Sequence, residues 1–131
     1  MLDANVLISA LLSRVGAPAR LLEACLEARF ELVVCPKLLT EIERALARPK
    51  LRARFEPVDA ARFVELVREL GDEVPDPEGS GPMHTTDPAD DYVLALAARG
   101  QVPLVSGDDH LLALRDRAPI FSPREFLDRL D

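Results

Sequence analysis

The sequence has no tryptophan, one tyrosine and only two cysteines among its 131 residues. Two cysteines are too few for a disulfide framework or a zinc cluster, so Cys25 and Cys35 are expected to be reduced thiols of the core. No apolar run reaches the ~20 residues that a membrane helix needs. Met1 to Asp3 contain no basic segment followed by an apolar stretch, so we expect no signal peptide and a cytoplasmic protein without membrane contact.

Positive charge is also scarce, with 16 Lys and Arg residues against 23 Asp and Glu residues and a net charge of −7. That balance argues against a protein that holds nucleic acid through its overall charge. What the chain does have is apolar residues, at 48% of the total. This fraction and the length predict one globular domain over residues 1–131.

Short apolar strands alternate with amphipathic helices along the chain. Helices are expected at Val6–Leu12, Ala17–Arg29, Lys37–Ala47, Pro57–Leu70, Asp87–Arg99, Asp108–Arg115 and Pro123–Leu130. Strands are expected at Met1–Ala4, Phe30–Cys35, Glu73–Pro75, Val102–Ser106 and Pro119–Phe121. Asn5 is expected to cap the first helix, and Gly71 to end the helix that precedes it. This alternation predicts an α/β fold with a parallel sheet covered by helices on both faces.

Acidic residues follow the strands of this predicted sheet. Asp3 closes the first strand, and Asp108 and Asp109 follow the strand Val102–Ser106. The carboxyl ends of parallel strands share one edge, where ligands bind in open α/β sheets. Carboxylates gathered there would repel one another unless a divalent cation lay among them, and oxygen ligands favour Mg²⁺ or Mn²⁺.

Helix capping explains some of these acids. Asp87, Pro88 and Asp90 form a helix start, with a cap, a proline in the first turn and an acid at the third position. Asp91 is left over on the packing side, and is therefore the better functional candidate. Asp108 can likewise cap a helix, and Asp109 can complement the helix dipole.

The periodicity of the helix Lys37–Ala47 does not show which of its two glutamates, Glu41 or Glu43, is the functional candidate. Its apolar face centres on Ile42, and Glu41 and Glu43 flank that centre symmetrically. A solvated position is the ordinary expectation for either side chain. His84 and His110 have no spacing typical of metal ligands, and we expect them to lie at the surface or to support other groups.

Four segments together resemble the PIN-domain family, and most closely the PIN-domain toxins of bacterial toxin–antitoxin pairs, of the VapC type. They are Leu2–Ala10 (LDANVLISA), Leu38–Ile42 (LLTEI), Asp87–Ala97 (DPADDYVLALA) and Leu104–Leu112 (LVSGDDHLL). They occur in the order of the family and span nearly the whole chain.

The resemblance implies a three-layer α/β/α fold with a central parallel five-stranded sheet and a Mg²⁺- or Mn²⁺-dependent endoribonuclease. Its acids fall on Asp3, Glu41, Asp91 and Asp108, which would hold the metal, with activated water cleaving the RNA phosphodiester. The supporting positions are Asn5, Ser106, Asp90 and Asp109. The resemblance also implies a homodimer and a small antitoxin partner, which the exposed apolar residues of the helix Pro57–Leu70 would serve.

Ala4 stands where the family has threonine, and His110 where it usually has a second acid. The histidine favours an alternative, a catalytically weakened PIN fold that acts through a protein partner. A phosphoryl-transfer enzyme with an aspartyl nucleophile is disfavoured, because Asn5 replaces the acid that it would need.

A basic run provides the positive surface that an RNA substrate would need. Its residues are Arg44, Arg48, Lys50, Arg52 and Arg54. This run is expected either to contact the RNA backbone or to be an ordinary solvated helix face.

Overall fold

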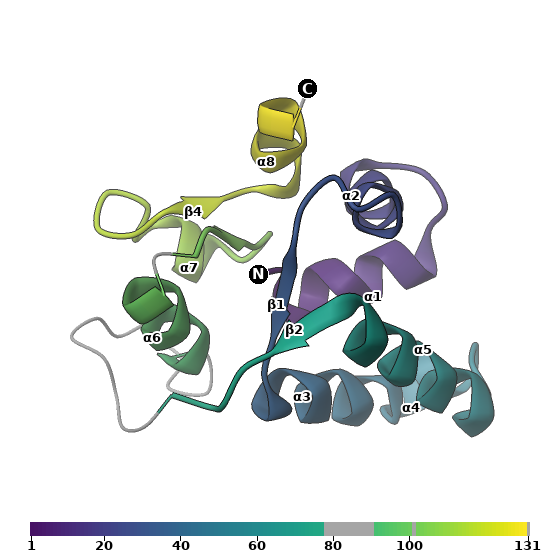
Figure 1. The fold of residues 1–131 in the computed structure, drawn as a ribbon. Helices are drawn as coiled ribbons and strands as arrows, with labels where there is room; N and C mark the ends of the chain where they lie inside the picture. Colours follow the sequence, from purple (N-terminus) through teal and green to yellow (C-terminus); the bar gives the residue numbers. More distant parts are fainter. Residues whose placement is uncertain (78–90, 101, 131) are drawn as a thin grey trace.

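The structure is a computed structural model that describes residues 1–77, 91–100 and 102–130 (Figure 1). Its helices are α1 (Ala4–Leu12), α2 (Ala17–Leu26), α3 (Pro36–Leu46), α4 (Pro49–Arg52), α5 (Pro57–Leu70), α6 (Asp91–Gly100), α7 (Asp109–Leu112) and α8 (Pro123–Leu130). Its strands are β1 (Leu32–Val34), β2 (Gly71–Glu73), β3 (Leu104–Val105) and β4 (Ile120–Phe121). The predicted bounds of α5 and α8 are confirmed, while α2, α7 and β3 are shorter than expected.

The strands pair in parallel, as the alternation of strands and helices predicts. β1 pairs with β2 from Leu32 opposite Gly71, and β3 pairs with β4 from Leu104 opposite Ile120. Leu2 forms a single parallel bridge with Val105 beside β3. These pairings, together with the helices between them, confirm the α/β class.

The expected central five-stranded sheet is wrong for the residues that the structure describes. Within the described ranges the ladders make two separate two-stranded sheets and the bridge at Leu2. The chain turns into α1 at Ala4, directly after Asp3. The segment before α1 pairs with Val105 beside β3, and in the described residues no bridge connects it to β1.

Helices pack around these strands on two sides. Figure 1 shows β1 between a group that contains α1 to α5 and a second group that contains α6, α7 and β4, while α8 packs against α2. The apolar face of α3 is buried as its periodicity predicts, and Ile42 at its centre is fully buried. This burial fixes which side of α3 faces the core and therefore which side its acidic residues can occupy.

The side chains of Asp3 and Asp76 cap the starts of α1 and α3, and local sequence predicts neither cap. The cap of α1 is Asp3, which accepts a hydrogen bond from the N–H of Val6, so the prediction of Asn5 as the cap is wrong. Asn5 instead lies exposed in the first turn. Asp76 accepts a hydrogen bond from the N–H of Lys37 at 2.9 Å, which ties the segment after β2 to the start of α3.

Gly71 joins α5 to β2 at a point with no room for a side chain. A Cβ atom there would lie 2.8 Å from Cγ1 of Val34 on the paired strand. The backbone of Gly71 is extended, so the glycine is needed for close approach rather than for an unusual φ. It ends α5 as predicted and also lets β2 pair closely with β1.

The thiols and the hydrophobic core follow the sequence predictions. Cys25 and Cys35 are both buried and free, and burial raises the pKa of the Cys35 thiol to about 11.

In the part of the chain that the structure describes, no helix is long and apolar enough to cross a bilayer. The predicted helix start formed by Asp87, Pro88 and Asp90 lies outside the described residues, and so does His84.

Candidate active site

Asp3 lies at the point where the N-terminal strand ends and α1 begins. Its N–H donates to the carbonyl oxygen of Val105 at 3.0 Å, which anchors it to β3. Its side chain is only 6% exposed. One carboxylate oxygen accepts from the N–H of Val6 at 2.9 Å, and the other accepts from the hydroxyl of Ser106 at 2.5 Å. Backbone and side chain therefore fix this carboxylate at the carboxyl end of the parallel strands.

Ser106 connects Asp3 to the loop after β3. It is fully buried, and its N–H donates to the carbonyl oxygen of Phe121 on the neighbouring strand. Its hydroxyl donates to Asp3 and accepts from the N–H of Asp108 at 3.0 Å. A single hydroxyl therefore positions Asp108 relative to Asp3. This contact gives a physical basis to the supporting role expected of Ser106.

Asp108 caps the short helix α7, as local sequence suggests. One of its carboxylate oxygens accepts from the N–H of His110 at 3.0 Å. Within the described residues its other oxygen makes no hydrogen bond and is available to a ligand. Capping and ligand binding therefore do not exclude each other here, because a carboxylate has two oxygens.

Glu41 approaches this group from α3. It is half-buried, and its Oε2 accepts a hydrogen bond from the hydroxyl of Tyr92 on α6. Glu43, two residues further, is exposed. The helix periodicity alone leaves the two glutamates equivalent. In the structure Glu41 accepts from Tyr92 and its charge acts on Asp3, whereas Glu43 does neither within the described residues.

The pKa of Asp3 depends on its burial, on its hydrogen bonds and on the neighbouring acids. Burial is the main reason that the pKa of Asp3 is raised above its ordinary value of 3.8. The hydrogen bonds from Ser106 and Val6 oppose that rise, whereas the negative charges of Glu41 and Asp108 add to it. A cation placed among the three would reverse the repulsion and favour the ionised form.

The remaining candidate residues are less tightly placed. Asp91 is the first residue of α6 and is half-buried, and Asp109 is exposed in the first turn of α7. Asp90 lies outside the described residues. Among the residues that the structure describes, no three His, Cys, Asp or Glu side chains meet in an arrangement that would hold a metal ion. Carboxylate oxygens are ligands that suit Mg²⁺ or Mn²⁺. In this structure, however, oxygens of Asp3 and Asp108 accept helix-cap hydrogen bonds and an oxygen of Glu41 accepts from Tyr92, so the described residues do not form a complete coordination shell.

A family model described as the PIN domain matches residues 1–110. The chain belongs to the PIN-domain family. The matched range contains Asp3, Glu41, Asp91, Ser106 and Asp108. Comparisons with curated proteins and with solved structures gave no match. PIN domains are generally nucleases, so membership supports nuclease activity for this chain.

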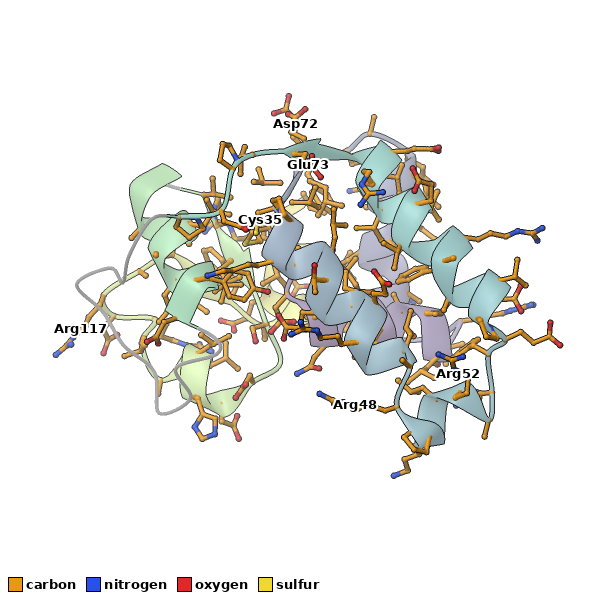
Figure 2. All side chains as sticks on the ribbon, turned by 90° about the horizontal axis from the view of Figure 1, so that it is seen from below. Cys35, Arg48, Arg52, Asp72, Glu73 and Arg117 are labelled. Atoms are coloured by element: carbon orange, nitrogen blue, oxygen red, sulfur yellow. The ribbon has the colours of Figure 1, made fainter. Side chains whose placement is uncertain are left out.

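The basic run of the PIN domain lies at one end of α3. Arg44 is in the last turn of α3, Arg48 caps α4, and α4 itself carries Lys50 and Arg52. All are exposed, as is Arg54, whose guanidinium lies 5.9 Å from the ring of Phe55. Figure 2 shows Arg48 and Arg52 at this end, with Asp72 and Glu73 at the opposite end of the same view.

Two residues that organise the site carry no signal of their own in the local sequence. Tyr92 is the only tyrosine of the chain and stands beside Asp91, the stronger candidate by residue type. Asp76 follows β2 outside any helix or strand, although its carboxylate fixes the start of α3. Both act through contacts with α3, across 51 residues for Tyr92 and 39 for Asp76, and no local pattern reports such contacts.

Proposed function

We propose that this PIN domain is a Mg²⁺- or Mn²⁺-dependent endoribonuclease, and the toxin component of a toxin–antitoxin pair in the cytoplasm. The observation that carries the proposal is the buried carboxylate of Asp3, held by Ser106 and repelled by the charges of Glu41 and Asp108. An ionised carboxylate in that setting is costly unless a cation offsets it. A protein retains such an arrangement where the cation serves a function.

The division of work among the residues follows from their contacts. Asp3, Glu41, Asp91 and Asp108 would hold the cation through oxygen atoms, which are the ligands that Mg²⁺ prefers. When bound, a divalent cation neutralises charge on the scissile phosphate and activates water for in-line attack. Ser106 keeps Asp3 and Asp108 in register, and the burial of Asp3 limits competition from bulk water.

The basic run would bind the RNA backbone beside these carboxylates. Glu41 and Arg44 are three residues apart on α3, so they lie on the same side of that helix. A strand whose phosphate is held near Glu41 would therefore continue past Arg44 towards α4. Replacing Arg48, Lys50 and Arg52 by alanine should flatten the dependence of log Kd on log salt by about 2, since each single-strand phosphate contact contributes roughly 0.7.

A matched control removes the same charge from another part of the surface. Arg20, Arg117 and Arg124 are exposed and lie outside the run, and the triple change of these three to alanine should leave the salt slope as in wild type. Equal slopes for both triple variants would remove the basic run from the proposal.

The cleavage experiment uses a single-stranded RNA with Mn²⁺ and compares conservative variants. Asp3→Asn, Asp91→Asn and Glu41→Gln are expected to lose cleavage, whereas Glu43→Gln, on the exposed side of the same helix, should cleave as wild type does. Retention of activity in both Asp3→Asn and Asp91→Asn would sink the assignment.

The toxin role and the assembly are supported by apolar side chains at the surface. Val58 on α5 and Leu26 at the end of α2 are 50% and 54% exposed. Such side chains would suit a homodimer contact or an antitoxin. Induced expression in a bacterium should arrest growth, and Asp3→Asn should relieve the arrest. Undiminished growth with the wild-type chain would contradict the toxin role.

A catalytically weakened PIN fold that acts through a protein partner is the second candidate. It is favoured by the exposed His110 where the family usually has an acid, and by the lack of a preformed three-ligand group in the described residues. Calorimetric titration with Mn²⁺ separates the two functions, because a weakened site should release no binding heat.

A further inference from the structure

The hydrogen bond between Tyr92 and Glu41 joins two elements that both carry candidate metal ligands. The phenol hydroxyl of Tyr92 on α6 donates to Oε2 of Glu41 on α3, in a partly buried position. Tyr92 directly follows Asp91, the first residue of α6. One contact therefore connects the helix of Asp91 to the helix of Glu41.

Glu41 needs such a contact to hold a defined position. The backbone of α3 is fixed by the burial of Leu38 and Ile42 on either side of Glu41 and by Asp76 at its start. The glutamate side chain nevertheless has three rotatable bonds, and the burial of α3 does not fix them. The phenol, which has a rigid ring on a two-bond stem, removes that freedom by holding one carboxylate oxygen.

The second oxygen of Glu41 is then left for a ligand. Across the described residues, Oε1 makes no hydrogen bond. The negative charge of Glu41 also helps to raise the pKa of Asp3. The carboxylate of Glu41 therefore has one oxygen held by Tyr92 and a second oxygen without a hydrogen bond in the described residues.

We propose that Tyr92 is a positioning residue that orients Glu41 toward the cation site and links the placement of Asp91 to that of Glu41. The proposal rests on the metal-dependent function above and adds to it a residue that touches neither RNA nor cation. Hydrogen-bond partners of this kind commonly change metal affinity by about 10–100-fold when removed.

The composition of the chain makes this contact observable. The sequence has no tryptophan and one tyrosine. All tyrosine emission of the protein therefore comes from Tyr92, and no tryptophan masks it. A phenol that donates to a carboxylate loses emission, because the excited phenol passes its proton to the acceptor. Tyr92 is thus a built-in reporter of the state of Glu41.

The first experiment compares tyrosine emission in wild type, Glu41→Gln and Glu43→Gln, each in metal-free buffer. Glu41→Gln is expected to be brighter than wild type, because the carboxylate acceptor is gone, and Glu43→Gln should match wild type. Addition of Mg²⁺ should raise wild-type emission in a saturable way and leave Glu41→Gln unchanged. Equal emission in all three proteins would overturn the contact.

The second experiment measures Mn²⁺ affinity of Tyr92→Phe by calorimetry. The variant keeps the ring and loses only the hydroxyl, so circular dichroism should show an intact fold. Its Mn²⁺ affinity is expected to fall about tenfold. RNA cleavage should recover toward the wild-type rate at saturating Mn²⁺, a separation of metal dependence from maximal rate that a purely structural role would not produce.

The outcomes separate this inference from the function on which it rests. If wild type binds Mn²⁺ and cleaves RNA while Tyr92→Phe binds Mn²⁺ equally well, the positioning role is wrong and the nuclease proposal stands. If wild type neither binds Mn²⁺ nor cleaves RNA, the nuclease proposal is wrong, and the role of Tyr92 at a cation site falls with it.

Discussion

Two aspartates of this chain begin helices at the same edge of the strands and are nevertheless set in different surroundings. Asp3 caps the nine-residue α1 and Asp108 caps the four-residue α7, each through a carboxylate oxygen and with an extended backbone. Asp3 is buried, and both of its oxygens accept hydrogen bonds. Asp108 is half-buried and uses one oxygen for the cap.

The difference shows that helix capping does not decide whether an acid is functional. A cap needs one oxygen and no burial, and Asp108 meets that need at the edge of the solvent. The burial of Asp3 exceeds what a cap requires and raises its pKa. The hydroxyl of Ser106 donates to the carboxylate of Asp3 and accepts from the backbone N–H of Asp108, so it connects the two residues.

The largest expected effect is on cleavage of RNA. Asp3→Asn should lower the Mn²⁺-dependent rate by about a hundredfold or more and Asp108→Asn by at least about tenfold, since the better-fixed ligand contributes more. Asp116→Asn, an exposed acid of the same C-terminal region, is the control and should leave the rate unchanged. A larger loss in Asp108→Asn than in Asp3→Asn would reverse the comparison.

The next effect is on stability through Ser106. Ser106→Ala removes a hydrogen bond to a buried carboxylate and should lower the free energy of unfolding by about 1–3 kcal/mol. Chemical denaturation measures the loss, with Ser9→Ala on the exposed side of α1 as the control, which should be neutral or slightly stabilising. A neutral Ser106→Ala would show that Asp3 does not depend on this hydroxyl.

The cap at α7 should have a smaller effect. Asp108→Ala is expected to cost about 1 kcal/mol, whereas Asp108→Asn should cost nearly nothing, because asparagine caps helices as well as aspartate does. Thermal unfolding of the two variants tests this. Equal destabilisation by both would mean that the charge of Asp108, and not its capping oxygen, stabilises the fold.

The smallest effect has an unusual sign and depends on pH. The pKa of Asp3 is raised in the folded protein, so the folded state binds this proton more tightly than the unfolded chain does. Its contribution to stability is present below the ordinary Asp pKa of 3.8 and is lost as pH rises through the folded value. In metal-free buffer at neutral pH, Asp3→Asn should therefore melt a few degrees above wild type.

That difference should shrink as the pH is lowered and Asp3 of the wild type becomes protonated. Melting curves across the acidic range, with a chelator present, measure it. A lower melting temperature for Asp3→Asn at neutral pH would show that the ionised carboxylate stabilises the metal-free fold.

Local sequence predicted the parts of the fold that local forces decide. The apolar side of α3 around Ile42, the bounds of α5 and the cap at Asp108 are confirmed. Each depends on the period of a helix or on a side chain two or three residues away. The cap of α1 shows the limit of local patterns. Asp3 and Asn5 are both residue types that cap helices, so local sequence does not distinguish them. The contact of Leu2 with β3 decides where the strand ends and therefore makes Asp3 the cap.

Contacts between distant segments were beyond local patterns. The symmetry of Glu41 and Glu43 about Ile42 is broken by a hydrogen bond that Tyr92, on α6, donates to Glu41. The single five-stranded sheet failed because ladder length depends on neighbours that periodicity does not report. Family resemblance selected Glu41 without explaining it, and the phenol contact now supplies a physical reason for its position.

The central claim is that the carboxylates around Asp3 form one site for a divalent cation. Calorimetric titration of the metal-free protein with Mn²⁺ tests it most directly, with wild type, Asp3→Asn and Asp116→Asn measured side by side. Saturable binding is expected in wild type and Asp116→Asn, and its loss in Asp3→Asn. Binding of equal affinity in Asp3→Asn, or no binding in wild type, would contradict the claim.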